Sequence, residues 1–414
     1  MKLNRMIFTG LKNASYLTMG TIIGMVINFI GFIFITRELG PTDYGIFATV
    51  TTYVSFFALI TMSQMAKVLI RRSVRDIDKM KKVYEKTIGV KKALALAAML
   101  LCLISTFIMP YTSETKLYIG IFSFNLIYLT FNQYFVAIFQ AVEKMQYQAF
   151  IQIMNRVIYV VFGITFLYLG FGLPAIIIIS LAANLISLGM NVKLSQRFVK
   201  IDYSKGFYWD KKIMRATIIF SIIMFISFFS TKIDILMISW LMEESDVGIY
   251  SVAVRLIEPV SQLKNIVSIA FFPIFVKFFS GKSIDKNQIF KYSIALGIVV
   301  FAGAAVASFL AKPIVPILFG EEFSRSGSIF SVLIFYSGFS FMNFPFMSSL
   351  QAANYERLLL KIVWIPAVSN VILNLVFLHF FGLIGIAYST LCVTAINYFV
   401  HMMLTRRLIK RGKI

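Results

Sequence analysis

Charged side chains lie inside several long apolar stretches of this 414-residue sequence. A charge at the centre of a bilayer is costly, so each is expected to face protein or water and to mark a functional path. Six of these side chains are basic and two are acidic, which predicts a cavity for an anionic ligand. The basic residues are Lys67, Arg156, Lys232, Arg255, Lys264 and Lys361, and the acids are Asp234 and Glu258.

Lys67 and Lys361 lie near the ends of their apolar stretches. The long stem of a lysine lets its amine reach the membrane surface from such a position. We therefore expect both to be interfacial anchors and the other four cations to lie deeper.

The stretch at 247–276 carries a stripe of polar side chains. Its members are four, three, four and three residues apart, which is the spacing of one helix face. They are Ser251, Arg255, Glu258, Gln262 and Asn265. Pro259 removes a backbone hydrogen bond and predicts a kink, as a gating helix needs. Two roles stay open for Arg255: it neutralises Glu258, three residues away, or it binds the ligand.

Lys232 and Asp234 are two residues apart, so they point roughly 160° away from each other around a helix. Each needs a partner elsewhere, and we expect Asp234 to offset Arg255. Other stretches carry scattered amides and hydroxyls, whose more common role is hydrogen bonding between helices. These are Thr21, Asn28, Asn125, Tyr128, Asn132, Gln152, Asn155 and Tyr159.

The elements that position these residues are membrane-spanning helices. Hydrophobic residues make up 59% of the chain and charged residues 14%, with a mean hydropathy of +0.83. Roughly 20 helical residues cross a hydrocarbon core of ~30 Å, and lipid cannot satisfy an open strand edge. We therefore predict an all-α polytopic membrane protein with about twelve spans. They are 14–36, 44–69, 93–110, 117–141, 151–169, 173–193, 216–241, 247–276, 290–311, 328–350, 358–380 and 383–405.

The formal charge of +22 reflects membrane topology. Nine Lys and Arg lie in 71–92, seven in 193–215 and five after residue 405, all in loops on one side. Loops on the other side hold four basic residues, which are Arg37, Lys116, Lys312 and Arg325. By the positive-inside rule, both termini are expected in the cytoplasm. Because topology explains the basic runs, nucleic acid is not an expected partner.

Three short sequence patterns recur about 200–210 residues later in the chain, which indicates an internal repeat; we call these recurrences echoes. The pattern of 42–47 returns at 245–250, QAVE at 140–143 returns as QAAN at 351–354, and FGLPAI at 171–176 returns as FGLIGI at 381–386. We predict two pseudo-symmetric six-helix lobes around a central cavity, related by an axis along the membrane normal. The predicted parts are an N-terminal lobe at 1–193, a basic cytoplasmic loop at 194–215 and a C-terminal lobe at 216–414.

The first echo lies in corresponding hairpin loops of the two lobes. Gly40 and Pro41 end one helix, and Asp43 can cap the next, as Asp246 can in the second copy. Gly45 and Gly248 complete the shared pattern. Capping is the ordinary role of such residues, and the duplication marks equivalent hairpins.

The segments TRELGPTDYGIFA and KIDILMISWLMEESDVGIYSVAVRLIEPV, followed by FFPIF, resemble the polysaccharide-transporter branch of the multidrug/oligosaccharidyl-lipid/polysaccharide exporter superfamily, which includes O-antigen repeat-unit flippases. The resemblance implies alternating-access flipping of an undecaprenyl-diphosphate-linked oligosaccharide across the bacterial cytoplasmic (inner) membrane, for polysaccharide biosynthesis. It implies membrane lipids and downstream polymerase machinery as partners. Asp234 and Arg255 match charged positions of the branch.

This resemblance leads to a hypothesis about the site. Arg255 and Lys232, helped by Arg156 and Lys264, hold the diphosphate, because Arg offers a planar fork and Lys a point charge. Asp234 or Glu258 tunes those cations or carries a coupling proton or sodium ion. No other cofactor is expected.

Two other functions are alternatives for a polytopic membrane protein. A multidrug cation antiporter has the same fold, but its cargo requires an acidic cavity. A polytopic glycan-modifying enzyme requires catalytic residues, and the sequence contains no recognisable catalytic motif. Cys102 and Cys392 lie in apolar stretches, and His379 and His401 are far apart, so no metal site is expected.

Overall fold

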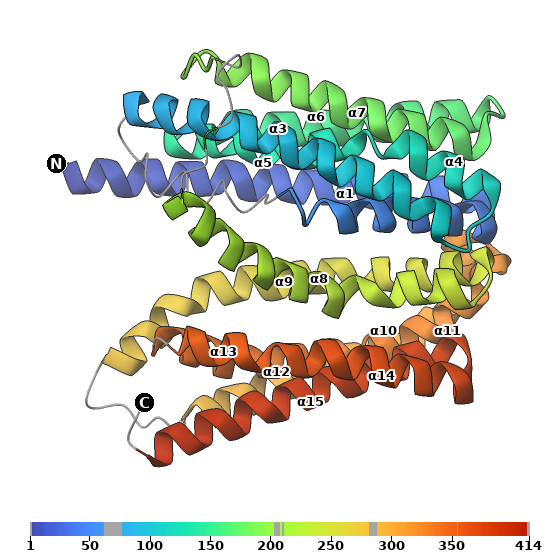
Figure 1. Ribbon diagram of the computed structural model, residues 1–414. Coiled ribbons are helices and arrows are strands. Elements are labelled where there is room, and N and C mark those ends of the chain that lie inside the picture. The colour runs from blue at the N-terminus through green and yellow to red at the C-terminus, as the bar shows by residue number, and fades with distance from the viewer. Residues whose placement is uncertain are drawn as a thin grey trace. The chain divides into compact units, whose positions relative to one another are not determined.

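The computed structural model describes residues 2–61, 77–202, 208, 211–280, 288–353 and 355–411. All secondary-structure elements in those ranges are helices, and nine helical stretches there are long and apolar enough to cross a membrane (Figure 1). The predicted all-α polytopic fold is confirmed. The helices are α1 (Lys2–Phe57), α3 (Ile77–Ile108), α4 (Ser113–Phe122), α5 (Asn125–Ala141), α6 (Met145–Tyr168), α7 (Gly172–Ser195), α8 (Lys211–Leu241), α9 (Glu244–Ser280), α10 (Gln288–Phe319), the 3-10 helix η1 (Glu321–Phe323), α11 (Ser324–Leu333), α12 (Tyr336–Ala352), α13 (Glu356–Ile362), α14 (Trp364–Phe381) and α15 (Leu383–Lys410).

The chain forms two compact units. Unit 1 comprises Met1–Leu39 and Ile46–Phe225, and unit 2 comprises Gly40–Gly45 and Ile226–Ile414. Within unit 1, α5, α6 and α7 pack on one another, and within unit 2, α12 packs on α9, α10 and α15. Part of the loop at 194–215 lies outside the described residues, and the lobe limits set there stay a prediction.

The first two predicted spans are the two arms of α1. Gly40 interrupts the helix with φ 70° and ψ 176°, a left-handed conformation that glycine adopts without steric cost. Pro41 then begins the second arm, where its fixed φ suits a first helical turn and its missing N–H costs little. The second arm ends at Phe57, and Lys67 lies outside the described residues.

The backbone repeats at the offsets of the sequence echoes. The fourth predicted span is broken at residues 123–124, between α4 and α5, and the tenth is broken at 334–335, between α11 and α12. Gly172 and Gly382, from the third echo, both have positive φ, at 58° and 63°. The two halves of the sequence therefore share local backbone features.

Buried apolar side chains hold the helices of each unit together. In unit 1, Tyr84 of α3 and Tyr134 of α5 are both 1% exposed and their ring centroids lie 4.5 Å apart. In unit 2, Ile289, Phe346 and Tyr398 form a cluster that joins α10, α12 and α15. These cores fix the faces that carry the polar residues described next.

Candidate functional site

Asp234 is buried in α8 and receives hydrogen bonds from three other helices of unit 2. It is 5% exposed, within a run at 233–238 that is buried throughout. Tyr250 Oη donates to Oδ2 at 2.9 Å, and Thr390 Oγ1 donates to the same oxygen at 3.1 Å. Asn374 Nδ2 donates to Oδ1 at 2.8 Å. All three donors are neutral, so no cation among the described residues neutralises the carboxylate.

More oxygen atoms lie close to this carboxylate. Asn374 also donates to Oδ1 of Asn370 at 3.0 Å, and the Thr390 hydroxyl lies 3.0 Å from the carbonyl oxygen of Ile386. Oδ1 of Asn374 is buried and has no hydrogen-bond partner among the described residues. Hard cations prefer carboxylate, amide and hydroxyl oxygens. This group of side chains, the Asp234 cluster (Asp234, Tyr250, Asn370, Asn374 and Thr390), can therefore bind a sodium ion or a proton.

The deep cations of unit 2 have partners other than those expected. Arg255 Nη1 lies 3.3 Å from the hydroxyl oxygen of Tyr44, and Lys232 Nζ lies 3.9 Å from Glu258 Oε1. Among the described residues, the hydrogen bonds of Asp234 come from Tyr250, Thr390 and Asn374, so the expected pairing of Asp234 with Arg255 is wrong. The physical reason is that Asp234 lies on the buried face of α8, whereas Lys232 lies on its half-exposed face, where Glu258 approaches.

The partners of Lys232 and Lys264 neutralise little of the positive charge of these two side chains. The Lys232 and Glu258 side chains are 38% and 51% exposed, and such an exposed pair contributes little binding energy. Lys264 Nζ donates to the neutral Ser340 Oγ at 2.9 Å. With Arg255 on the same helix as Lys264, these residues form a positively charged stretch of α8 and α9 that can attract an anion.

Unit 1 contains a polar cavity of about 280 Å³. Its walls come from α1, α5, α6 and α7, and include Thr21, Tyr128, Gln152 and Asn191. Among the described residues that line it, Arg156 carries the one charge. The cavity therefore suits a ligand that is rich in hydrogen-bonding groups and is neutral or anionic.

Amide side chains join the helices around this cavity. Asn155 donates to Asn184 at 3.0 Å, Asn184 donates to Asn125 at 2.9 Å, and Asn191 donates to Asn132 at 2.9 Å. The predicted role of Asn125, Asn132 and Asn155 in interhelical hydrogen bonding is thus seen directly.

Several residues of these sites were missed from the sequence. In α7, Asn184, Ser187 and Asn191 are three and four residues apart, a helical spacing that could have revealed them. Asn370 and Asn374 are likewise four apart, but amides at this spacing are common in membrane helices and do not single out a site.

Lys91 belongs to the basic run at 71–92, so its sequence context predicts a loop residue and does not reveal its buried position. It is fully buried in α3, and its Nζ donates to the carbonyl oxygen of Thr61 at 2.8 Å, in the turn that follows α1. A cation bound to the last carbonyls of a helix stabilises that end. We therefore interpret Lys91 as structural.

The two copies of the hairpin motif contact each other within unit 2. A Cβ atom built on Gly45 would lie 1.7 Å from the carbonyl oxygen of Glu244, and one on Gly248 would lie 1.9 Å from that of Pro41. The contact is reciprocal, because Pro41 and Glu244 occupy equivalent places in the two copies. Nearby, Asp246 binds Arg325 Nη1 at 3.0 Å. The glycines thus allow a close crossing that no other residue permits.

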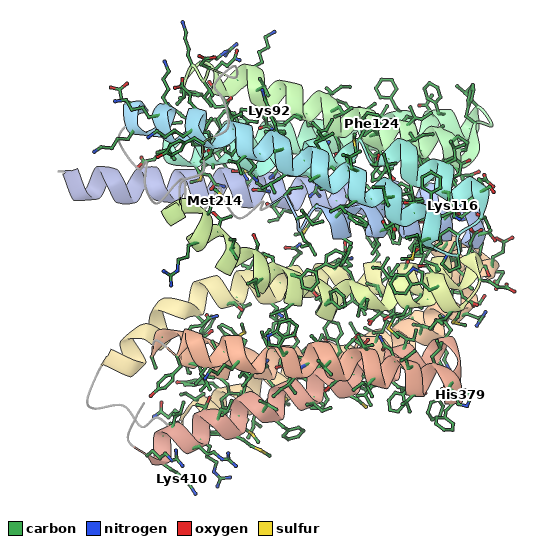
Figure 2. All side chains as sticks on the ribbon, viewed as in Figure 1. Lys92, Lys116, Phe124, Met214, His379 and Lys410 are labelled. Carbon is green, nitrogen blue, oxygen red and sulfur yellow. The ribbon has the colours of Figure 1, made fainter. Side chains whose placement is uncertain are left out.

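The remaining candidates lie apart from these groups. Asp43 is half-buried in the segment 40–45 of unit 2, and Lys361 is exposed on α13. Figure 2 shows His379 near the turn where α15 begins and Lys410 at the other end of that helix. Arg156 belongs to unit 1, whereas Lys232, Arg255 and Lys264 belong to unit 2.

Proteins that resemble this chain in sequence or fold include flippases and a multidrug transporter. Residues 10–279 match the family described as polysaccharide biosynthesis protein. The probable low-salt glycan biosynthesis flippase Agl15 of Haloferax volcanii is 23% identical over 406 residues, which cover 94% of this chain and 82% of that protein.

Two solved structures share the fold. An inward-facing multidrug resistance MATE family transporter of the MOP superfamily aligns with a TM-score of 0.74 and 15% identity, over 96% of this chain and 98% of its own. The lipid II flippase MurJ, in an inward closed conformation, aligns with a TM-score of 0.73 and 15% identity, over 94% and 87%. At these identities the two structures establish the fold of the chain.

Proposed function

The chain belongs to the polysaccharide biosynthesis protein family, and from this premise we propose that it is a flippase for a lipid-linked oligosaccharide. Its cargo is an undecaprenyl-diphosphate-linked repeat unit, moved across the bacterial cytoplasmic membrane by alternating access for surface polysaccharide such as O-antigen. Both termini lie in the cytoplasm. Agl15 is named as a probable glycan biosynthesis flippase and MurJ as a lipid II flippase, which supports this class of cargo.

The observation that carries the proposal is the set of cations on α8 and α9. Lys232 has an exposed partner and Lys264 a neutral one, so the charge of both lysines is available to a ligand, and Arg255 lies on the same helix as Lys264. A diphosphate presents several charged oxygens to such a group, and charge-assisted hydrogen bonds to them are strong. Membrane lipids hold the undecaprenyl chain, and the polymerase machinery that uses the flipped unit is the downstream partner.

We propose that the Asp234 cluster binds the coupling cation. Its carboxylate has neutral donors, and a buried amide oxygen of Asn374 lies in the same cluster without a partner among the described residues. A sodium ion would use both oxygens. A proton would use the carboxylate alone, and the two cases differ in their response to sodium.

The test measures transfer of a fluorescent undecaprenyl-diphosphate oligosaccharide between leaflets of proteoliposomes. Arg255→Ala and Lys232→Ala should each lower the rate about tenfold or more, because a hydrogen bond to a charged group contributes about 1.5–3 kcal/mol. Lys361→Ala is the matched control, since Lys361 is an exposed cation of the same unit, and it should retain the wild-type rate.

The alternative is a multidrug cation antiporter, whose fold is the same. The same vesicles loaded with an organic cation test it. Export of that cation without any lipid transfer would overturn the flippase proposal. The absence of an acid among the described residues that line the unit 1 cavity argues against a cationic cargo there.

A further inference from the structure

The cavity of unit 1 has a size and a wall chemistry that point to a ligand. At about 280 Å³ it is just below the usual range for small-molecule pockets, roughly 300–1,000 Å³. It is large enough for a sugar ring and too small for a long oligosaccharide. Its wall side chains are mostly amides and hydroxyls, which both donate and accept hydrogen bonds.

Two buried atoms of the wall indicate which hydrogen bonds the ligand must make. Ser187 and Asn191 line the cavity from α7, and their Oγ and Oδ1 atoms are buried without a hydrogen-bond partner among the described residues. The amide nitrogen of Asn191 is already used, because it donates to Asn132. The remaining carbonyl oxygen can only accept, so a ligand group that reaches it must donate a hydrogen bond.

The need for a hydrogen-bond donor favours a sugar over a diphosphate as the ligand of this cavity. An ionised phosphate oxygen only accepts hydrogen bonds, and it would meet the Asn191 carbonyl oxygen with repulsion. A sugar hydroxyl donates one hydrogen bond and accepts others, so it satisfies both Asn191 and the amide donors around it. The wall of this cavity therefore fits a sugar ring better than it fits a diphosphate.

Arg156 adds a charge requirement. It is the one charged residue among the described residues of the lining, so the cavity suits an acidic group better than a basic one. A Cβ atom built on Gly24 would lie 2.9 Å from Arg156 Cδ and 3.0 Å from both Cζ and Nε. The absence of a side chain at Gly24 thus lets the arginine lie directly against α1, where its planar group can bind a carboxylate with two parallel hydrogen bonds.

We propose that this cavity is a subsite for an acidic sugar, and that it binds one uronic acid ring of the glycan. Arg156 binds the sugar carboxylate, and Asn191 and Ser187 bind ring hydroxyls. The inference rests on the proposed flippase function and deepens it, because it assigns Arg156 to the glycan and leaves the diphosphate to Lys232, Arg255 and Lys264.

The test uses two lipid-linked probes that differ in one group. Both are undecaprenyl-diphosphate disaccharides, one ending in glucuronate and the other in glucose, and their transfer is compared in proteoliposomes. Wild type should move the glucuronate probe about tenfold faster, the factor expected for one charge-assisted interaction. Arg156→Gln should remove that preference, and Arg156→Lys should keep part of it, since lysine has the charge without the fork.

Gly24→Ala provides a variant that keeps the arginine. Its new methyl group must displace Arg156, so the preference for glucuronate should fall although the charge remains. Arg197→Gln is the matched control, because Arg197 is an exposed arginine of unit 1 just after α7, and its preference should equal that of wild type.

A second readout is independent of transport. Sodium glucuronate, compared with sodium chloride at the same sodium concentration, should raise the melting temperature of the purified wild-type protein and not that of Arg156→Gln, whereas glucose added to the same sodium chloride should raise neither. Equal transfer of both probes with no glucuronate shift overturns the subsite and leaves the flippase proposal standing. A glucuronate shift without transfer of either probe supports the subsite and overturns the flippase proposal.

Discussion

At the scale of single residues, the informative feature is the set of hydrogen-bond donors around the buried carboxylate of Asp234. Asp234 lies among apolar neighbours and is bound by a phenol, an amide and a hydroxyl, none of which is charged. A buried carboxylate with neutral donors keeps its affinity for a cation, whereas one paired with arginine does not. The Asp234 cluster is therefore suited to reversible ion binding.

Asp234→Asn tests this interpretation. The variant keeps the shape but loses the charge, and one hydrogen-bond acceptor becomes a donor, so we expect a destabilisation of about 1–3 kcal/mol. Sodium chloride, compared with choline chloride, should raise the melting temperature of wild type and not that of the variant. The control is Asp246→Asn, an acid of the same unit that pairs with Arg325, and it should keep the sodium response. A sodium response that survives in Asp234→Asn rules out this site.

At the scale of elements, the two motif copies show what a repeated loop does. Each copy supplies one glycine and one carbonyl group to the same crossing. Capping predicts only that each loop serves its own helix, and Glu244 and Asp246 do occupy the first turn of α9, where acids are favoured. The crossing shows a second role for the motif, since the glycine of each copy packs against a carbonyl group of the other copy.

Gly45→Ala and Gly248→Ala should both destabilise the protein by about 1–3 kcal/mol or more, the usual cost of overpacking. The new methyl group would lie within 2 Å of a backbone carbonyl oxygen, which cannot move aside as a side chain can. Gly189→Ala and Gly303→Ala are matched helical controls with open space around them, and should be neutral or slightly stabilising. Thermal unfolding of the four variants distinguishes the crossing from a general effect of helix glycines.

The positions of the helices could be predicted from the sequence, whereas the contacts between helices could not. Long apolar runs and the echoes at 140–143 and 171–176 predicted the spans and the repeat, because both depend on local composition. The helix spacing placed Lys232 and Asp234 on opposite faces, as observed. It could not show which neighbouring helix meets each face, so the expected partner of Asp234 was wrong and Tyr250 and Thr390 were missed.

At the scale of the whole molecule, the distribution of basic residues predicts how the chain is oriented in the membrane. The predicted basic loops alternate along the chain, and the positive-inside rule predicts that both termini lie on the side richer in Lys and Arg. The energetic basis is the cost of carrying basic loops across the membrane during insertion. The same bias explains +22 without any nucleic-acid partner.

Cysteine labelling tests the orientation. In a variant without Cys102 and Cys392, a cysteine replacing Lys116 should react with a membrane-impermeant maleimide in intact cells. A cysteine replacing Lys410, at the end of α15, should react only after the membrane is opened. Reaction of both positions, or of Lys410→Cys alone, in intact cells would contradict the assigned topology.

The crossing of the two motif copies also bears on the order in which the chain is completed. Residues 40–45 belong to unit 2, but they are synthesised about 200 residues before Glu244 and Gly248. At ~5–20 residues per second, the turn at Gly40 waits roughly 10–40 s for its counterpart. A ribosome-bound chain that stops before residue 240 should therefore leave this turn open to proteolysis, and its protection would signal that the second half has been inserted.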